Sequence, residues 1–506
     1  PETVLTRVHE TVDKIWREKL IPECWNKKWL CPKPKVDPEI ATLNDLRPLN
    51  LLETPRKLLM GIIVKRITTV WESRGILSES QYGFRPQRSC EGPTLQVLNA
   101  QEEAEESGTE FHGSSWDIKR AFDTVPKSVL VMSWERLGVP SVVANYIVDM
   151  DRNCLTIPLT PHAQHIKNVQ GLDAITTQPS SETTAQGFYG VTGTPQGDTP
   201  SPSNFNAALD IPLKALETAH SYPFMVRTDT ELTNAEAIAF ADDVYTFAAR
   251  QEGQQEKADI MSASAAILGV FFATQKLRTT AKSWGNETAS PLTAEYHLTI
   301  HDKDWSPVQI PVKYAQPNTD HSFRYLGVHM DVNNTFDNQY TMALAQVQEV
   351  ATRAHHKLAS PETITMAIRM STHRKVSFPG KFAPWSLMEM RRLDIPLTTL
   401  YKHHLKFMHS TPTALLHMDK EVGGLNIIRL SDQINIDKWA MMIRGLYSDS
   451  ATAVATLGIL NRCLRIGQTD TDKGYEAIVQ PTNIPQHMRS LLELMEESGY
   501  YLRRAG

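Results

Sequence analysis

The spacing of hydrophobic residues changes along the chain between the period of a helix and that of a strand, which predicts a mixed α+β protein. Residues 4–20, 57–67 and 342–358 repeat an apolar residue every three or four positions, as amphipathic helices do. Residues 237–247 show the strand pattern instead. There, Ile238 and Phe240 alternate with small residues, and an apolar, β-prone run resumes at Val244.

Asp242 and Asp243 interrupt this β-prone stretch and predict a hairpin with both carboxylates at its tip. Neighbouring carboxylates repel each other, so their position beside apolar strands favours a divalent cation with oxygen ligands. An ordinary polar hairpin tip is the alternative, because an Asp-Asp pair is a weak signal by itself.

A third carboxylate, Asp117, stands at the end of another predicted strand. A two-metal site needs ligands from more than one segment, because bridging carboxylates hold both ions. Asp117 can supply that distant ligand. Asp123 starts the next predicted helix, where an acidic residue is common for capping reasons, so we expect it to be structural.

Length and composition indicate a multidomain protein without membrane spans. The chain has 506 residues, 41% of them hydrophobic, and two to four subdomains are expected. No stretch approaches the run of about 18 apolar residues that a span needs, and no signal-peptide pattern is present. The five cysteines are scattered, which predicts reduced thiols in an intracellular protein that is not secreted.

Charge is unevenly distributed in this chain of net charge −5. Residues 1–100 carry 16 Lys and Arg against 12 Asp and Glu, and residues 351–410 carry 10 against 3. Two basic regions suggest a positive groove facing a polyanion, although solvated helix faces would give the same composition. The acidic run at residues 102–106 is predicted to be a solvated helix surface.

Basic and glycine-containing segments add candidate ligand contacts. Lys33 lies in a proline-stiffened segment, and the forked guanidinium groups of Arg47 and Arg85 suit phosphate, although structural salt bridges are an alternative for each arginine. In the loop at 190–202, Gln196 offers an amide, and Gly197 permits close approach of the backbone to a ligand.

Taken in order, these segments resemble a reverse transcriptase, and specifically that of a non-LTR (LINE-type) retrotransposon. The matching motifs cover about residues 20–450, and their conjunction is more specific than any one of them. They are Arg47-Pro48, Gly83-Phe84-Arg85-Pro86, Asp117 to Asp123, Gln196-Gly197-Asp198, Phe240 to Asp243, Tyr325-Leu326-Gly327 and Gly423-Gly424-Leu425. Thr199-Pro200 departs from the Pro-Leu usual in the family.

The resemblance implies an α+β right-hand polymerase with a ferredoxin-like palm and a helical thumb. Fingers would comprise residues 1–115, with a fingers/palm insertion at 127–185. The palm would comprise residues 116–126 and 186–335, and the thumb residues 336–450. Residues 451–506 would form a C-terminal helical extension.

The resemblance also implies the chemistry of RNA-directed DNA synthesis. Asp117, Asp242 and Asp243 would be catalytic and would hold two Mg²⁺ ions, for which Mn²⁺ is a possible substitute. Contacts to the nucleotide or template are expected from Lys33, Arg47, Arg85, Phe122, Gln196, Gly197 and Lys276. Phe122 would exclude a ribose 2′-hydroxyl, with a core position as the alternative, and Lys276 would protonate pyrophosphate unless it is a surface lysine. Tyr325, Leu326 and Gly327 would form the primer grip.

The partners implied are an RNA template, a DNA primer or target and dNTPs, in the nucleus, for retrotransposition. The sequence does not say which proteins bind the chain. Two alternatives stay open. One is a catalytically inactive, reverse-transcriptase-like RNA-binding scaffold. The other is a group II intron maturase-like or domesticated reverse transcriptase.

Overall fold

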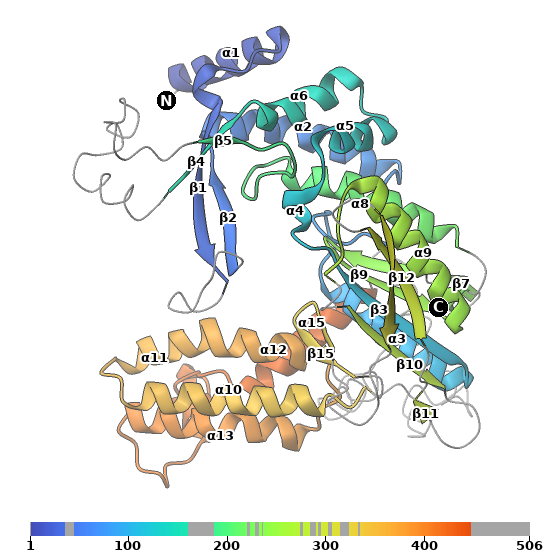
Figure 1. Ribbon diagram of the computed structural model, residues 1–506. Helices are drawn as coiled ribbons and strands as arrows, with labels where there is room; N and C mark the ends of the chain where they lie inside the picture. Colours follow the sequence, from blue (N-terminus) through green and yellow to red (C-terminus); the bar gives the residue numbers. More distant parts are fainter. Residues whose placement is uncertain are drawn as a thin grey trace, which may run out of the picture.

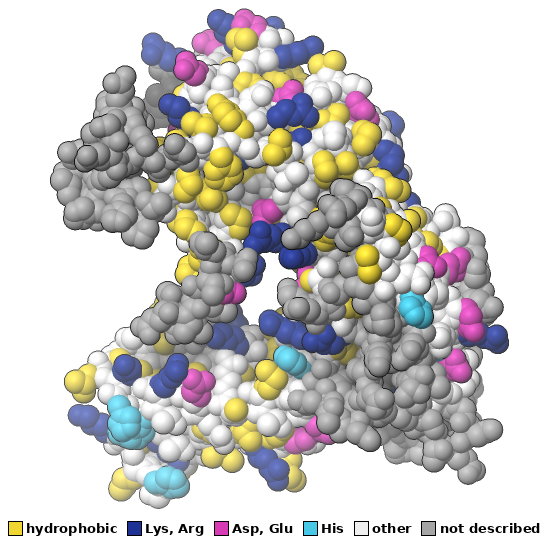
Figure 2. All heavy atoms as spheres, in the orientation of Figure 1, with side chains coloured by type: hydrophobic (Ala, Val, Ile, Leu, Met, Phe, Trp, Pro, Cys, Tyr) yellow, Lys and Arg dark blue, Asp and Glu magenta, His cyan; other side chains and the backbone are white. Residues whose placement is uncertain are grey.

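Three lobes surround a central opening in the computed structural model (Figure 1). It describes residues 2–35, 45–159, 187–219, 223–227, 232–234, 236–273, 277–283, 290–291, 295–301, 306–313, 323–331 and 334–446. The space-filling view keeps the opening and shows Lys and Arg side chains gathered on its border (Figure 2). No helix in the described ranges is long and apolar enough to cross a membrane.

The upper lobe combines four helices with a four-stranded sheet of order β2-β1-β4-β5. Its elements are α1 (Glu2–Glu18), η1 (Glu23–Trp25), β1 (Lys27–Pro34), β2 (Leu46–Leu51), α2 (Thr54–Ser73), α5 (Lys127–Arg136), α6 (Ser141–Arg152), β4 (Leu155–Pro158) and β5 (Phe188–Tyr189). Strand β1 pairs antiparallel with β2 and parallel with β4. The β1–β2 pair extends as an arm toward the lowest lobe (Figure 1).

The middle lobe is built on a five-stranded sheet of order β11-β10-β3-β9-β8, in which all paired neighbours are antiparallel. Its elements are β3 (Glu110–Asp117), α8 (Ser201–Glu217), β8 (Ala237–Phe240), β9 (Asp243–Ala248), α9 (Gln251–Leu268), β10 (Arg278–Ser283) and β11 (Ser290–Pro291). The chain order β3-α8-β8-β9-α9-β10 is the split β-α-β-β-α-β arrangement. The predicted ferredoxin-like core is therefore confirmed.

The two faces of this sheet bury different cores. Trp116 and Val244 point to the face covered by α8 and α9, which shares a core with the upper lobe. Tyr245 and Phe247 point to the other face, where α3 (Glu91–Ser107), β14 (Phe323–Tyr325), β15 (Val328–Met330) and the helical lobe pack. The sheet thus links both outer lobes, since each lobe contributes to the core on one of its faces.

The helical lobe is formed by the C-terminal part of the described chain. Its elements are α10 (Asp337–His355), α11 (Pro361–Ile368), η4 (Arg369–His373), α12 (Arg374–Gly380), α13 (Leu387–His404), α14 (Ala414–His417), η5 (Lys420–Val422) and α15 (Leu430–Leu446). The η4 segment is a π-helical turn between α11 and α12. The remaining short elements are α4 (Ala121–Thr124), β6 (Met225–Arg227), β7 (Leu232–Asn234), β12 (Glu295–His301) and β13 (Pro307–Lys313).

The structure corrects several details of the predicted elements. The helix expected at 342–358 ends at His355, so Leu358 lies beyond it and is fully exposed. Glu102 and Glu103, expected on a solvated surface, are 7% and 4% exposed because α3 packs against the sheet. Strand β3 crosses the boundary expected at residue 115/116. The C-terminal extension at 451–506 lies outside the described residues.

Candidate active site

Asp117 and Asp243 are brought together by strand register. They are the last residue of β3 and the first residue of β9, and they are direct partners across the antiparallel pair. Partners of this kind place their Cβ atoms about 4.5–5.5 Å apart on the same face of a sheet. Both carboxylates are half-buried. Because like charges in this position repel, the pair favours a bound cation.

Asp242 adjoins this pair from the hairpin loop. Phe240 pairs with Asp243, so the loop consists of Ala241 and Asp242 alone, and Asp243 already belongs to the strand instead of the tip. Ala241 has a positive φ of 55° while Asp242 does not, as in a type II′ turn. Asp117, Asp242 and Asp243 therefore lie at the same edge of the sheet, where β3 ends and β9 begins.

The donor chemistry at this edge fits magnesium. The described residues include no group of three or more His, Cys, Asp or Glu side chains that could by itself hold a metal ion. Mg²⁺ is commonly bound through one or two carboxylates together with substrate phosphates, and it does not need a closed protein cage. Asp117 and Asp243 could supply those carboxylates, with Asp242 beside them, and the metal assignment stays a prediction.

A buried glutamine that sequence reasoning missed holds the Asp-Asp loop in place. Gln81 is 2% exposed, and its Oε1 accepts hydrogen bonds from the N–H groups of Ala241 at 2.9 Å and Gly83 at 2.7 Å. The backbone on either side continues the contact, because Tyr82 donates to Ala239 at 2.8 Å. A Cβ on Gly83 would lie 2.2 Å from the nitrogen of Ala241, so only glycine permits this approach.

The hairpin expected to be a primer grip lies on the same face of the sheet. Tyr325 is 1% exposed and its ring packs edge-on against Tyr245, with centroids 5.5 Å apart. Burial raises the pKa of the Tyr325 hydroxyl well above its ordinary value, and nearby Asp243 raises it further. Leu326 and Gly327 form the two-residue loop, both with positive φ. The primer-grip role stays a prediction.

On the arm of the upper lobe, Lys33 and Arg47 are direct cross-strand partners, and both are exposed. Two like charges opposite each other are unfavourable unless an anion lies between them. Burial raises the pKa of Asp123, although the nearby cations Arg120 and Lys35 act to lower it. The arm therefore presents a cationic face that suits a phosphate group.

The Gln196-Gly197 loop packs against this arm. The N–H of Asn50 in β2 donates to the carbonyl of Gln196 at 2.7 Å. A Cβ on Gly197, whose φ is 107°, would lie 2.7 Å from the carbonyl oxygen of Asn50. The close backbone approach expected of Gly197 toward a ligand is thus made to the chain's own strand, while the Gln196 side chain is half-buried.

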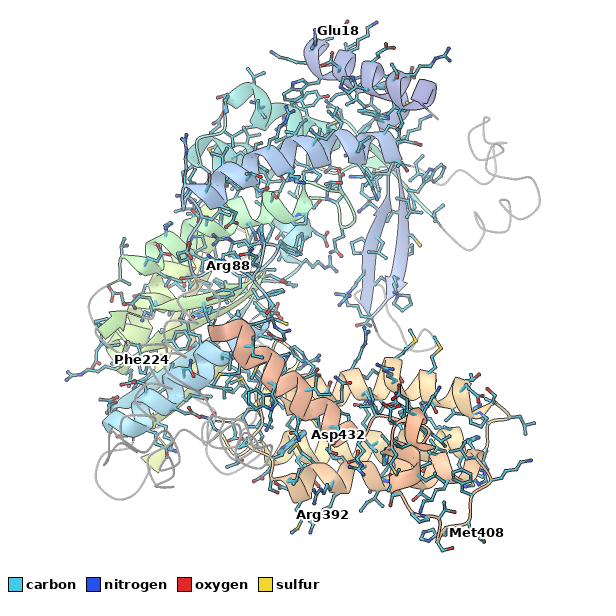
Figure 3. All side chains as sticks on the ribbon, turned by 180° about the vertical axis from the view of Figure 1, so that it is seen from behind. Glu18, Arg88, Phe224, Arg392, Met408 and Asp432 are labelled. Carbon is cyan, nitrogen blue, oxygen red and sulfur yellow. The ribbon has the colours of Figure 1, made fainter. Side chains whose placement is uncertain are left out.

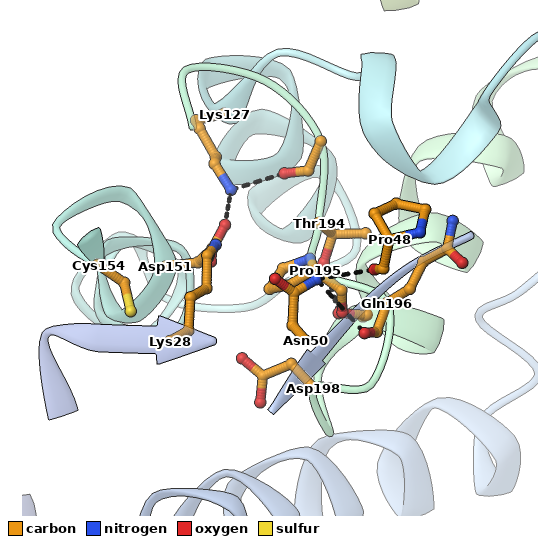
Figure 4. Close-up of polar contacts among 12 residues, drawn as sticks. Lys28, Pro48, Asn50, Lys127, Asp151, Cys154, Thr194, Pro195, Gln196 and Asp198 are labelled. Carbon is orange, nitrogen blue, oxygen red and sulfur yellow. Dashed lines mark hydrogen bonds and ion pairs between the residues drawn. The ribbon is translucent and has the colours of Figure 1, made fainter. Parts of the chain in front are cut away.

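A buried ionic network under this loop was not visible in the sequence. Lys28 and Lys127 both bind the carboxylate of Asp151, and Lys127 also donates to the carbonyl of Gly193 at 2.6 Å (Figure 4). Burial alone would raise the pKa of Asp151, but the two lysines outweigh it and lower that pKa. The network ties β1 to the start of the loop.

A second buried pair anchors the end of the loop. Arg56 binds Asp198 at 2.7 Å, with side chains 0% and 1% exposed. Arg56 also donates to the carbonyl of Trp25 at 3.2 Å, so α2, the loop and the entry to β1 meet at one guanidinium.

Arg85, expected to contact the nucleotide or template, forms structural contacts within the protein. Its side chain is 2% exposed and forms two parallel hydrogen bonds of 2.8 Å with Glu72. It also donates to the carbonyl of Ser78 at 2.7 Å. This arrangement favours the alternative of a structural salt bridge, because its donors point into the protein.

Phe122 is half-buried between two aromatic rings. It stacks on Phe205 with centroids 4.8 Å apart and meets Phe84 edge-on at 6.1 Å. Phe84 is 53% exposed, so this cluster reaches the surface. One side of the Phe122 ring is packed as a core position would require. Its role in excluding a ribose 2′-hydroxyl stays a prediction. Lys276 lies outside the described residues.

Comparison with known proteins adds a family match. Residues 31–330 match the family model described as reverse transcriptase (RNA-dependent DNA polymerase). The Pol polyprotein of the type-1 retrotransposable element R2 from Popillia japonica is 26% identical over 44% of this chain. The RNA-directed DNA polymerase of the mobile element jockey from Drosophila melanogaster is 18% identical over 71% of it. The chain spans 28% and 35% of the length of these two relatives.

A structural comparison gives a weaker likeness. The telomerase from Candida albicans in complex with a TWJ fragment of telomeric RNA aligns with a TM-score of 0.35 and 10% identity. The alignment covers 87% of this chain and 69% of that one. So low a score adds nothing to the family match, which covers more than half of the chain.

Proposed function

Because the chain belongs to the reverse transcriptase (RNA-dependent DNA polymerase) family, we propose that it extends the 3′-hydroxyl of a primer with dNTPs on an RNA template. The expectation of a LINE-type enzyme is confirmed by the two relatives from mobile elements. The observation that carries the proposed chemistry is the direct pairing of Asp117 with Asp243, with Asp242 next in the loop.

The carboxylates Asp117, Asp242 and Asp243 would hold the divalent ions. When bound, such ions make a primer hydroxyl more acidic and stabilise the charge of the leaving pyrophosphate. Gln81 would keep Asp242 in position by fixing the backbone of Ala241. A displacement of a catalytic group by about 1 Å can cost about 10²-fold in rate, so this support bears on turnover.

The other contacts would bind and orient the substrates. Lys33 and Arg47 project from the same face of the arm and would bind the triphosphate. Phe122, held by Phe205, would limit space near the 2′ position of the nucleotide and so favour dNTPs. Tyr325 and its loop would support the primer end beside Asp243. Retrotransposition into a DNA target would place this activity in the nucleus.

Primer extension on an oligo(dT)-primed RNA template tests the proposal, with Mg²⁺ and Mn²⁺ supplied separately. We expect metal-dependent DNA synthesis that Asp242→Asn abolishes, with primer–template affinity unchanged. Asp259→Asn, on the exposed side of α9, is the matched control and should synthesise DNA normally.

The outcomes separate the alternatives. Unimpaired extension by Asp242→Asn would refute the carboxylate assignment. Binding of primer–template without any synthesis by the wild-type protein would favour an inactive RNA-binding scaffold. Incorporation of rNTPs as efficiently as dNTPs would contradict the role given to Phe122.

A further inference from the structure

A cavity of about 580 Å³ lies between η4, α12 and α15 of the helical lobe and the start of α3. Four cationic side chains line it: Arg369 from η4, Arg374 at the start of α12, Lys381 directly after its end, and Arg444 from α15. Two carboxylates, Glu91 and Asp437, also line it. The lining therefore has an excess of two positive charges, which favours an anionic ligand.

The two arginines near η4 are available to a ligand. Arg369 and Arg374 are exposed, and neither forms an ion pair with another described residue. The other two cations are positioned by Glu91, which binds Lys381 and also Arg444 at 2.7 Å. Burial alone would raise the pKa of Glu91, but hydrogen bonds from Arg444 and Lys381 lower it. One side of the cavity is thus fixed, and the other presents unpaired guanidinium groups.

His373 gives an independent indication of a ligand. Its side chain lines the cavity and is 3% exposed, yet neither ring nitrogen has a hydrogen-bond partner. Burial and the nearby Arg369 lower the pKa of His373 to about 4, so the ring is neutral near pH 7 and carries one N–H donor. Buried polar groups are normally paired, and an acceptor entering the cavity would supply the missing bond.

His373 is the last residue of the π-helical turn and lines the cavity. The turn at Arg369–His373 widens the helix between α11 and α12. Such turns often occur at functional sites. A π-helical turn interrupts the regular hydrogen bonding of the helix. Such irregular backbone geometry tends to cluster at functional sites.

The β14–β15 hairpin lies between the cavity and the carboxylate edge, by which we mean the edge of the sheet that carries Asp117, Asp242 and Asp243. The electrostatic neighbours of the Tyr325 hydroxyl include both Asp243 and Cys90, the residue before α3. Gly327 in the same hairpin lies 4.0 Å, measured from an ideal Cβ, from the ring of Phe378, which lines the cavity. A strand whose 3′ end lies at Asp117 and Asp243 would pass this hairpin on its way toward the helical lobe.

We propose that this cavity binds one backbone phosphate of the nucleic-acid strand that leaves the carboxylate edge, through Arg369, His373 and Arg374. The identity of the strand rests on the proposed polymerase function. Guanidinium groups pair with phosphate oxygens through two parallel N–H groups, and the imidazole N–H of His373 adds a third donor group. The site would hold the strand by one defined phosphate instead of by a diffuse positive surface.

The test measures binding of fluorescein-labelled RNA–DNA hybrids by anisotropy, without dNTPs. Each hybrid carries one neutral methylphosphonate linkage, placed at successive positions of either strand. For the wild-type protein we expect one position at which the neutral linkage weakens binding about tenfold. Arg369→Gln/Arg374→Gln should bind the unmodified hybrid about tenfold more weakly and lose the sensitivity at that position. The slope of log affinity against log salt should fall by about 1.

A matched pair of arginines controls for the loss of charge. Arg391 and Arg392 are exposed on α13, and Arg392 lies on the side of the helical lobe away from the opening (Figure 3). Arg391→Gln/Arg392→Gln should shift all hybrids equally and keep the wild-type position dependence. His373→Gln, which keeps a neutral N–H donor, should retain more of the position dependence than His373→Leu.

Three results would overturn the proposal. They are a wild-type profile with no sensitive position, the same sensitive position in Arg369→Gln/Arg374→Gln, and displacement of the hybrid from wild type by millimolar inorganic phosphate, which would indicate a free-anion site. Failure of the polymerase proposal is distinguishable, because a protein with one sensitive position but no DNA synthesis would retain this site.

Discussion

The substitution Gln81→Leu tests whether the Asp-Asp loop depends on the buried carboxamide. Leucine is similar in size to glutamine but accepts no hydrogen bond. The N–H groups of Ala241 and Gly83, now 2.9 and 2.7 Å from Gln81 Oε1, would both lose their acceptor. A buried donor left unpaired costs about 1–3 kcal/mol. The two together predict a local cost of about 2–6 kcal/mol.

This cost can be reduced only if the loop moves so that the amides find other partners. Ala241 precedes Asp242 directly, so a loop movement that gives the Ala241 amide a new partner also displaces the Asp242 carboxylate. A shift of about 1 Å predicts a fall in kcat of about 10²-fold, measured as steady-state primer extension in Mg²⁺. Primer–template affinity should stay unchanged, because the Gln81 side chain is buried. Mn²⁺, which tolerates less regular coordination, should restore part of the activity.

Gln101→Leu is the matched control. Gln101 is also fully buried, in α3, but neither its amide oxygen nor its nitrogen has a hydrogen-bond partner. Its replacement leaves no new unpaired group and removes two, so we expect stability at or above that of wild type and unchanged kcat. The reasoning is wrong if Gln81→Leu retains kcat within about twofold of wild type, or if both variants lose activity equally.

Three further predictions concern charge. Arg47→Gln should raise the KM for dNTPs about tenfold and leave primer–template affinity unchanged, since a charge-assisted bond contributes about 1.5–3 kcal/mol; an equal loss in both would contradict a triphosphate contact. Arg56→Met should destabilise the protein in urea by about 3–5 kcal/mol by leaving Asp198 buried and unpaired, and adding Asp198→Leu should recover most of the loss. The pKa of His373 in the folded protein, about 4, lies below its ordinary value of 6.5, so the melting temperature should fall as the pH drops from 6.5 toward 4. His373→Gln should make this fall smaller.

The sequence predicted the elements whose signal is local. The alternation around Ile238 and Val244 gave the hairpin, and helical spacing from Val4 gave α1. The order of motifs predicted the ferredoxin-like core, which the topology confirms. The sequence pattern also predicts Asp117 at a strand end, where it lies.

The features that sequence reasoning missed depend on contacts between distant segments. Gln81 stands in the same basic turn as Arg85, and composition gives no reason to separate a loop-supporting amide from a ligand-binding arginine. Their roles follow from what packs on them: β8 beside Gln81, and Glu72 of α2 beside Arg85. Glu102 and Glu103 illustrate the same limit, because an acidic run is buried only when another part of the chain covers it.

The direct register of β3 and β9 constrains where insertions and deletions can accumulate. Asp117 and Asp243 face each other because of hydrogen-bonded pairing, and the length of chain between the two strands does not enter into it. Connecting segments can therefore lengthen or shorten between relatives without moving either carboxylate. A single residue added within β3 or β9 would instead turn one carboxylate to the opposite face of the sheet. Length variation should be common in the connections and rare within these two strands.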